Sequence, residues 1–115
     1  MIASEFEELR LAAIAAGYKP VRLTDDSKAF LLEGVQKPWN PLTDDGDALR
    51  LAVKLEIVPS KHDDTIVASR SAAWRLGPAH CSLWEQVRDD PYAATRLAIT
   101  RAAAEIGKQM GGGNV

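Results

Sequence analysis

Three segments of the chain carry apolar residues at helical spacing. In the first segment these residues are Phe6, Leu9, Ala13 and Ala16. Spacings of three and four positions predict a helix over about residues 4–16. Ser4 and Glu7 have the spacing of a capping box, and Gly17 is suited to the left-handed conformation that ends a helix.

A second helix is predicted from Asp44 or Asp45 to about Leu55. Its apolar stripe consists of Ala48, Leu51, Ala52 and Leu55. Leu49 and Val53 form a flanking stripe, so this helix is expected to bury a wide face.

The third helix is predicted over Tyr92 to about Lys108. Asp90 is suited to the N-cap position and Pro91 to the first helical position. One face of this helix consists of Ala94, Leu97, Ala98, Arg101, Ala102 and Ile106. Its small alanine side chains would let the helix lie close against a sheet.

Short apolar or alternating segments between the first two helices predict a hairpin. Its strands are Lys19–Leu23 and Ala29–Leu32, and residues 24–28 between them are rich in turn-forming side chains. The alternation places Val21 and Leu23 on one face of the hairpin.

The region 57–87 predicts two or three further strands. Thr65–Arg70 has the composition of a strand, and His80–Glu85 alternates between apolar and polar residues. Gly77–Ala79 is a turn signal, and Lys61–Asp64 is expected to form a solvated loop.

The order of these elements predicts one α+β domain over residues 1–109, with three helices and four or five mainly antiparallel strands. Residues 110–115 are glycine-rich and are expected to form a flexible tail. The periodicity leaves open whether the helices cover one face of the sheet or both.

Composition narrows the class of protein further. The 115 residues are 46% hydrophobic and carry a formal net charge of −2, which argues against electrostatic nucleic-acid binding. Cys81 is the only cysteine, so a disulfide framework and a cysteine-rich zinc site are excluded. The chain has no apolar run long enough for a membrane span and begins with an acidic segment, so a cytoplasmic protein is expected.

Three carboxylates, those of Asp44, Asp45 and Asp47, stand within four residues. They could hold a cation or act as an acid–base pair. The calcium loop of an EF-hand does not fit, because aligning its central glycine with Gly46 leaves no oxygen donor at the first and last ligand positions. The favoured interpretation is that these residues cap the second helix and complement its dipole.

Trp39 and Asn40 precede this acidic segment. A tryptophan in a proline-flanked loop can fill the core or serve as an exposed interface anchor, and Asn40 can bond its own backbone to hold a turn. Trp74 and Trp84 in the strand region could stack on a base or a sugar, although such residues more often pack in the core between helices and sheet.

Catalytic and cofactor motifs are absent from the sequence. His80 and Cys81 are adjacent on a predicted strand and would point to opposite faces, which precludes a nucleophile–base pair. His62–Asp64 is more typical of a turn than of a metal site. No glycine-rich phosphate loop occurs, so we expect no enzyme activity, metal or cofactor.

Two segments, Trp39–Ile57 and Asp90–Ile106, resemble the phage ABA-sandwich domain proteins, which look related to the NinX-like phage proteins. The shared features are Asn40-Pro41, Asp47-Ala48, Asp90-Pro91 and Ala93-Ala94. This resemblance implies a small α/β/α sandwich around one central sheet and an origin in a phage or prophage genome. It implies no activity.

These observations favour a non-enzymatic accessory protein that binds a host or phage protein or associates with itself in the bacterial host cytoplasm. The candidate binding residues are Trp39, Asn40, Asp44, Asp45 and Trp84. One alternative is a nucleotide or metabolite site at the Trp39–Asp47 loop. Another is a divalent-metal-dependent hydrolase that uses the three carboxylates.

Overall fold

The structure is a computed structural model, and it describes residues 3–25, 29–34, 37–70, 81–86 and 90–110. The side chains of 3–4, 62, 70 and 81–86 lie outside this description. The helices are α1 (Ala3–Ala15), α2 (Asp45–Leu55) and α3 (Pro91–Gln109). The strands are β1 (Pro20–Leu23), β2 (Phe30–Leu32), β3 (Val58–His62), β4 (Thr65–Arg70) and β5 (Cys81–Gln86).

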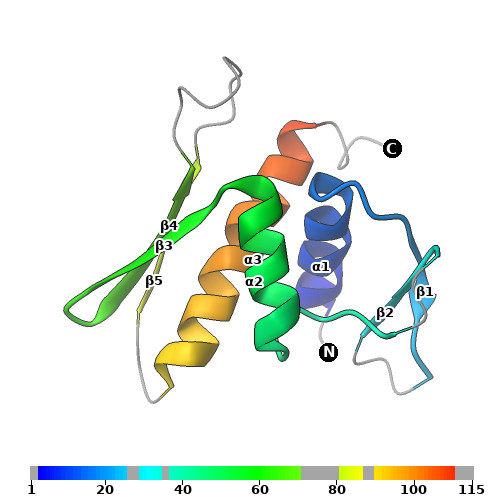
Figure 1. Cartoon of the computed structure of the whole chain (residues 1–115), viewed down its shortest axis with the longest axis horizontal. Helices are drawn as coiled ribbons and strands as arrows, with labels where there is room; N and C mark the ends of the chain where they lie inside the picture. Colours follow the sequence, from blue (N-terminus) through cyan, green and yellow to red (C-terminus); the bar gives the residue numbers. More distant parts are fainter. Residues whose placement is uncertain (1–2, 26–28, 35–36, 71–80, 87–89, 111–115) are drawn as a thin grey trace.

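The strands form two separate antiparallel sheets, not one. The first contains β1 and β2, and the second has the order β3-β4-β5. The three helices lie between the two sheets (Figure 1). The α+β class is therefore confirmed for the described residues, whereas the expected α/β/α sandwich with one central sheet is wrong.

The central element is α3. It contacts α1, α2 and all three strands of the second sheet. Its buried residues are Ala94, Ala98, Ile99, Thr100, Ala102, Ala103, Ala104, Ile106 and Gly107. Because many of the buried side chains of α3 are small, other elements can approach this helix from several directions. A helix therefore takes the central position at which a sheet was expected.

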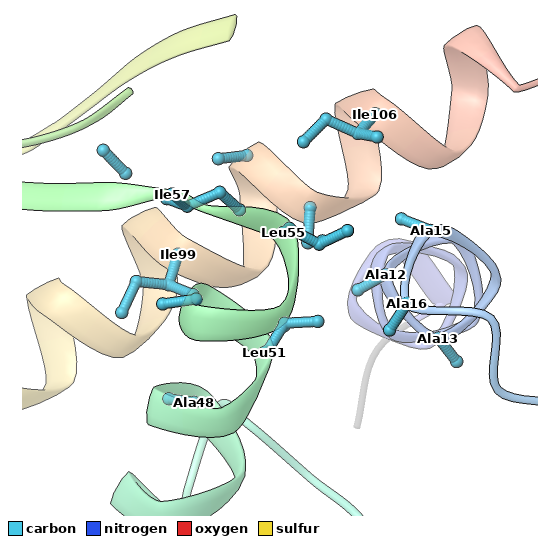
Figure 2. Packing of buried hydrophobic residues seen from close by; sticks show 14 of the residues in the cluster. Ala12, Ala13, Ala15, Ala16, Ala48, Leu51, Leu55, Ile57, Ile99 and Ile106 are labelled. Carbon is cyan, nitrogen blue, oxygen red and sulfur yellow. The ribbon is translucent and has the colours of Figure 1, made fainter. Parts of the chain in front are cut away.

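α1 and α3 approach each other closely near the end of α3. A Cβ atom at Gly107 would overlap the backbone carbonyl group of Leu11. Ala12 of α1 and Ala16, which directly follows this helix, lie in the same hydrophobic core (Figure 2). An ion pair between Arg101 Nε and Glu8 Oε2, 3.1 Å apart, joins the two helices at the surface.

α2 buries one narrow face. Ala48, Leu51 and Leu55 lie in the core between the helices (Figure 2). Leu49 and Val53 are 63% and 69% exposed. The expected wide buried face is therefore wrong, because α1 and α3 cover only the first of the two apolar stripes.

The predicted hairpin of β1 and β2 is confirmed, but the predicted placement of Val21 and Leu23 on one face is wrong. Arg22 pairs with Leu31 and Pro20 with Leu32, so the register shifts at Val21. This irregularity leaves Val21 64% exposed, whereas simple alternation would place it beside Leu23.

The second sheet begins with a tight hairpin. His62 pairs with Thr65, and Asp63 adopts a left-handed conformation in the turn. Lys61 and His62 thus belong to β3, and the expected loop over Lys61–Asp64 shortens to two residues. The turn signal Gly77–Ala79 lies outside the described residues.

The three helix predictions are confirmed within about one residue at each end. Asp44 and Asp90 are the N-caps of α2 and α3. Gly17 has a φ of 80° after α1, and Tyr18 N–H donates to the Ala13 carbonyl there. The glycine-rich tail from residue 111 lies outside the described residues.

Candidate functional site

The loop of residues 39–47, which we call the 39–47 loop, joins the first sheet to α2. Trp39 forms an isolated antiparallel bridge with Phe30, and its amide donates to the Phe30 carbonyl over 2.8 Å. The Trp39 side chain is only 5% exposed and meets the Tyr18 ring edge-on at 5.8 Å. Trp39 therefore fills the core and is not an exposed anchor.

Asn40 holds the turn that follows. Its side-chain Oδ1 accepts from the amide of Leu42 over 2.8 Å, and its carbonyl accepts from the amides of Thr43 and Asp44. Pro41 beside it is fully buried. This is the backbone-bonding role that the sequence suggested for Asn40.

Asp47 is the buried carboxylate of the loop. It is 5% exposed; its Oδ2 accepts from the Asn40 amide over 3.0 Å and its Oδ1 from Arg50 Nη2 over 2.8 Å. The hydrogen bond from Arg50 to Asp47 raises the pKa of the guanidinium above its ordinary value. The Oδ2 of Asp47 thus holds Asn40 against the first turn of α2, whereas its Oδ1 binds Arg50 within the same helix.

The other two carboxylates have different partners. Asp44 Oδ2 accepts from the amide of Asp47 over 2.8 Å, which is the N-cap bond. Asp45 Oδ1 binds Arg96 Nη1 of α3 over 2.6 Å, and Arg96 Nε also donates to the carbonyl of Leu42. Arg96 thereby fastens the loop to α3.

The three carboxylates consequently do not converge on a common point. Each binds a donor of the fold, and within the described part of the chain no group of three His, Cys, Asp or Glu side chains is placed to hold a metal ion. The arrangement supports the structural interpretation of Asp44, Asp45 and Asp47, and the geometry that a metal-dependent hydrolase requires is not found there.

Several other candidate residues fall outside the description. Trp74 and His80 belong to the segment 71–80, and for Cys81 and Trp84 only the backbone of β5 is described. The binding role expected for Trp84 therefore stays a prediction.

The structure points to a surface that the sequence analysis missed. Leu49 and Val53 stand one turn apart on the outer side of α2, and we call the surface that these two residues form the outer face of α2. Lys54 beside it lies 4.7 Å from the centre of the Tyr18 ring. The signal was the second apolar stripe of this helix, which we had assigned to the core.

Comparison of the chain with models of protein families, with curated proteins and with solved structures finds no significant match. In the described residues, none of the helices combines the length and apolar character needed to cross a bilayer.

Proposed function

We propose that this chain is a non-enzymatic accessory protein of a phage or prophage that binds another protein through the outer face of α2. The phage part of the proposal rests on the resemblance of Trp39–Ile57 and Asp90–Ile106 to the phage ABA-sandwich proteins. The binding part rests on the exposure of Leu49 and Val53.

The outer face of α2 has the features of a helix that packs against a partner. Its two large aliphatic side chains are 63% and 69% exposed and one helical turn apart, which is the spacing of anchors in helix-mediated recognition. The positively charged Arg50 and Lys54 stand beside them along the helix. A polar rim around an apolar centre is typical of protein interfaces.

The rigidity of α2 adds to this support. Asp44 caps its N-terminus, and the amide of Glu56 donates to the carbonyls of Ala52 and Val53 at its C-terminus. A helix held at both ends presents its side chains with little loss of entropy on binding.

The alternative of a nucleotide or metabolite site at the 39–47 loop has less support. Asp44 and Asp47 bind donors of the fold, and Trp39 is buried. A ligand at this loop would have to break those hydrogen bonds before it could make its own.

The test compares the wild type with a Leu49→Gln, Val53→Gln double variant. Glutamine favours a helix and removes the apolar contact, so the free energy of unfolding changes by less than about 0.5 kcal/mol. We expect association, with itself or with a captured host or phage protein, to weaken at least tenfold. Light scattering and affinity capture measure it.

The matched control is Val21→Thr, because Val21 is equally exposed but lies on β1. This variant is expected to associate as the wild type does. A wild type that neither associates nor captures a protein would contradict the proposal, as would equal association by the double variant.

A further inference from the structure

A pocket of about 320 Å³ lies between the second sheet and the start of α3 and shares no lining residue with the 39–47 loop. We call it the β3–α3 pocket. It is lined by Pro59, Ser60, Lys61, Ile66, Pro91, Tyr92 and Thr95. Its volume is at the lower end of the range of small-molecule sites. The β3–β4 hairpin and the start of α3 lie on the same side of the molecule (Figure 1).

The strand register places Lys61 at this pocket. Lys61 pairs with Ile66, and paired residues of neighbouring strands share one face of the sheet. Ile66 is 3% exposed, so this face is the one turned towards the core. Lys61 therefore lines the pocket from the outer strand of the sheet.

The Lys61 ammonium group is available to a ligand. Among the described residues it makes no ion pair or hydrogen bond, and it is the only charged group of the pocket lining. Thr95 already donates its hydroxyl hydrogen to the Pro91 carbonyl. The amides of Tyr92 and Ala93 at the start of α3 already donate to the Asp90 carboxylate, so these two amides are not available to bind an anion.

The walls of the pocket are apolar. Ile66, Pro59 and Pro91 line it with apolar side chains, and Tyr92 is 70% exposed. An exposed aromatic ring beside prolines is a suitable surface for a flat apolar group.

We infer that the β3–α3 pocket binds a small molecule with a flat apolar body and one carboxylate, the body against Tyr92 and the carboxylate on Lys61. A phosphate group fits less well, because it is usually held by several donors and this pocket offers one ammonium group. This site is independent of the outer face of α2.

The probe for this proposal is benzoate, and its neutral counterpart is benzamide. The two share the same ring and differ in charge, and the net charge of −2 gives the chain no general attraction for anions. In amide NMR titrations of the whole chain we expect saturable shifts confined to residues 60–61, 66 and 92–95, because Pro59 and Pro91 carry no amide hydrogen. Benzoate is expected to bind about threefold to fivefold more tightly than benzamide, as for one exposed ion pair.

Three variants locate the site. Lys61→Gln is expected to remove the preference for benzoate and leave benzamide binding unchanged. Tyr92→Ala is expected to weaken both probes. The control Lys37→Gln, at an exposed lysine of another segment, is expected to change neither. The exposed positions of these side chains mean that all three variants keep the wild-type spectrum elsewhere.

Two results would overturn the inference. One is the absence of saturable shifts with either probe, or shifts that spread over the surface. The other is a preference for benzoate that survives Lys61→Gln. Neither result bears on association through the outer face of α2, so the two proposals fail separately.

Discussion

Asp47 is a candidate metal-binding or acid–base residue by its sequence context, but its role in the structure is to hold the fold. The sequence predicted a cap at Asp44 or Asp45, because capping depends on residues about three positions apart. It did not predict that Asp47 would bind the amide of Asn40, seven residues earlier. That bond depends on the path of the 39–47 loop, which is set by Trp39 entering the core.

Removing the Asp47 carboxylate is predicted to destabilise the protein. In Asp47→Ala the buried amide of Asn40 loses its acceptor, which is expected to lower the free energy of unfolding by about 1–3 kcal/mol. Urea unfolding followed by circular dichroism measures this loss. In the control Asp45→Ala, the removed side chain is 72% exposed, so at most about 1 kcal/mol is expected. An equal loss in both variants would contradict the role assigned to Asp47.

Trp39 is predicted to matter for stability more than for binding. Trp39→Ala leaves a cavity beside Tyr18 and is expected to cost about 3–5 kcal/mol of the free energy of unfolding. Tyr92→Ala removes an exposed ring and is expected to cost less than about 0.5 kcal/mol. Thermal unfolding of the two variants measures both losses of stability. A Trp39→Ala variant as stable as the wild type would argue against the core position of this side chain.

At the scale of elements, the sequence predicted the bounds of the helices well but not which of their faces would be buried. Caps, proline positions and apolar spacing are local signals, and they located α2 and α3 within about a residue. Which stripe of α2 would be covered depended on the positions of α1 and α3. The stripe of Leu49 and Val53 was therefore assigned to the core, although the structure exposes it.

The contact between α1 and α3 is predicted to tolerate no side chain at Gly107. In Gly107→Ala the new Cβ meets the backbone of Leu11, which cannot rotate away as a flexible side chain would. The helices must separate, and a loss of at least about 2 kcal/mol in the free energy of unfolding is expected, despite the higher helix propensity of alanine. Chemical denaturation measures it.

The neighbouring exposed position provides the control. Lys108→Ala changes a side chain on the surface of the same helical turn and is expected to stay within about 0.5 kcal/mol of the wild type. If Gly107→Ala proved as stable as Lys108→Ala, the close approach of the two helices would be refuted.

At the scale of the whole molecule, the α+β class followed from the order of elements, but the layering did not. In the described residues each strand pairs with the next strand along the chain, but periodicity within a strand does not show whether two such groups of strands join into one sheet. The β1–β2 hairpin closes on Trp39, whereas β3–β5 packs against α3. Two separate sheets result, one at each side of the helices.

The pairing of α1 with α3 has a consequence for how the chain is made in the cell. The ion pair of Glu8 and Arg101 joins residues 93 positions apart. At usual rates of protein synthesis, roughly 5–20 s pass between the appearance of α1 and that of its partner. During this interval α1 can contact the β1–β2 hairpin, for example through the rings of Phe6 and Phe30, but the side of α1 that faces α3 has no partner. We therefore expect folding to wait for translation to reach α3, and a stalled nascent chain to be a substrate for chaperones.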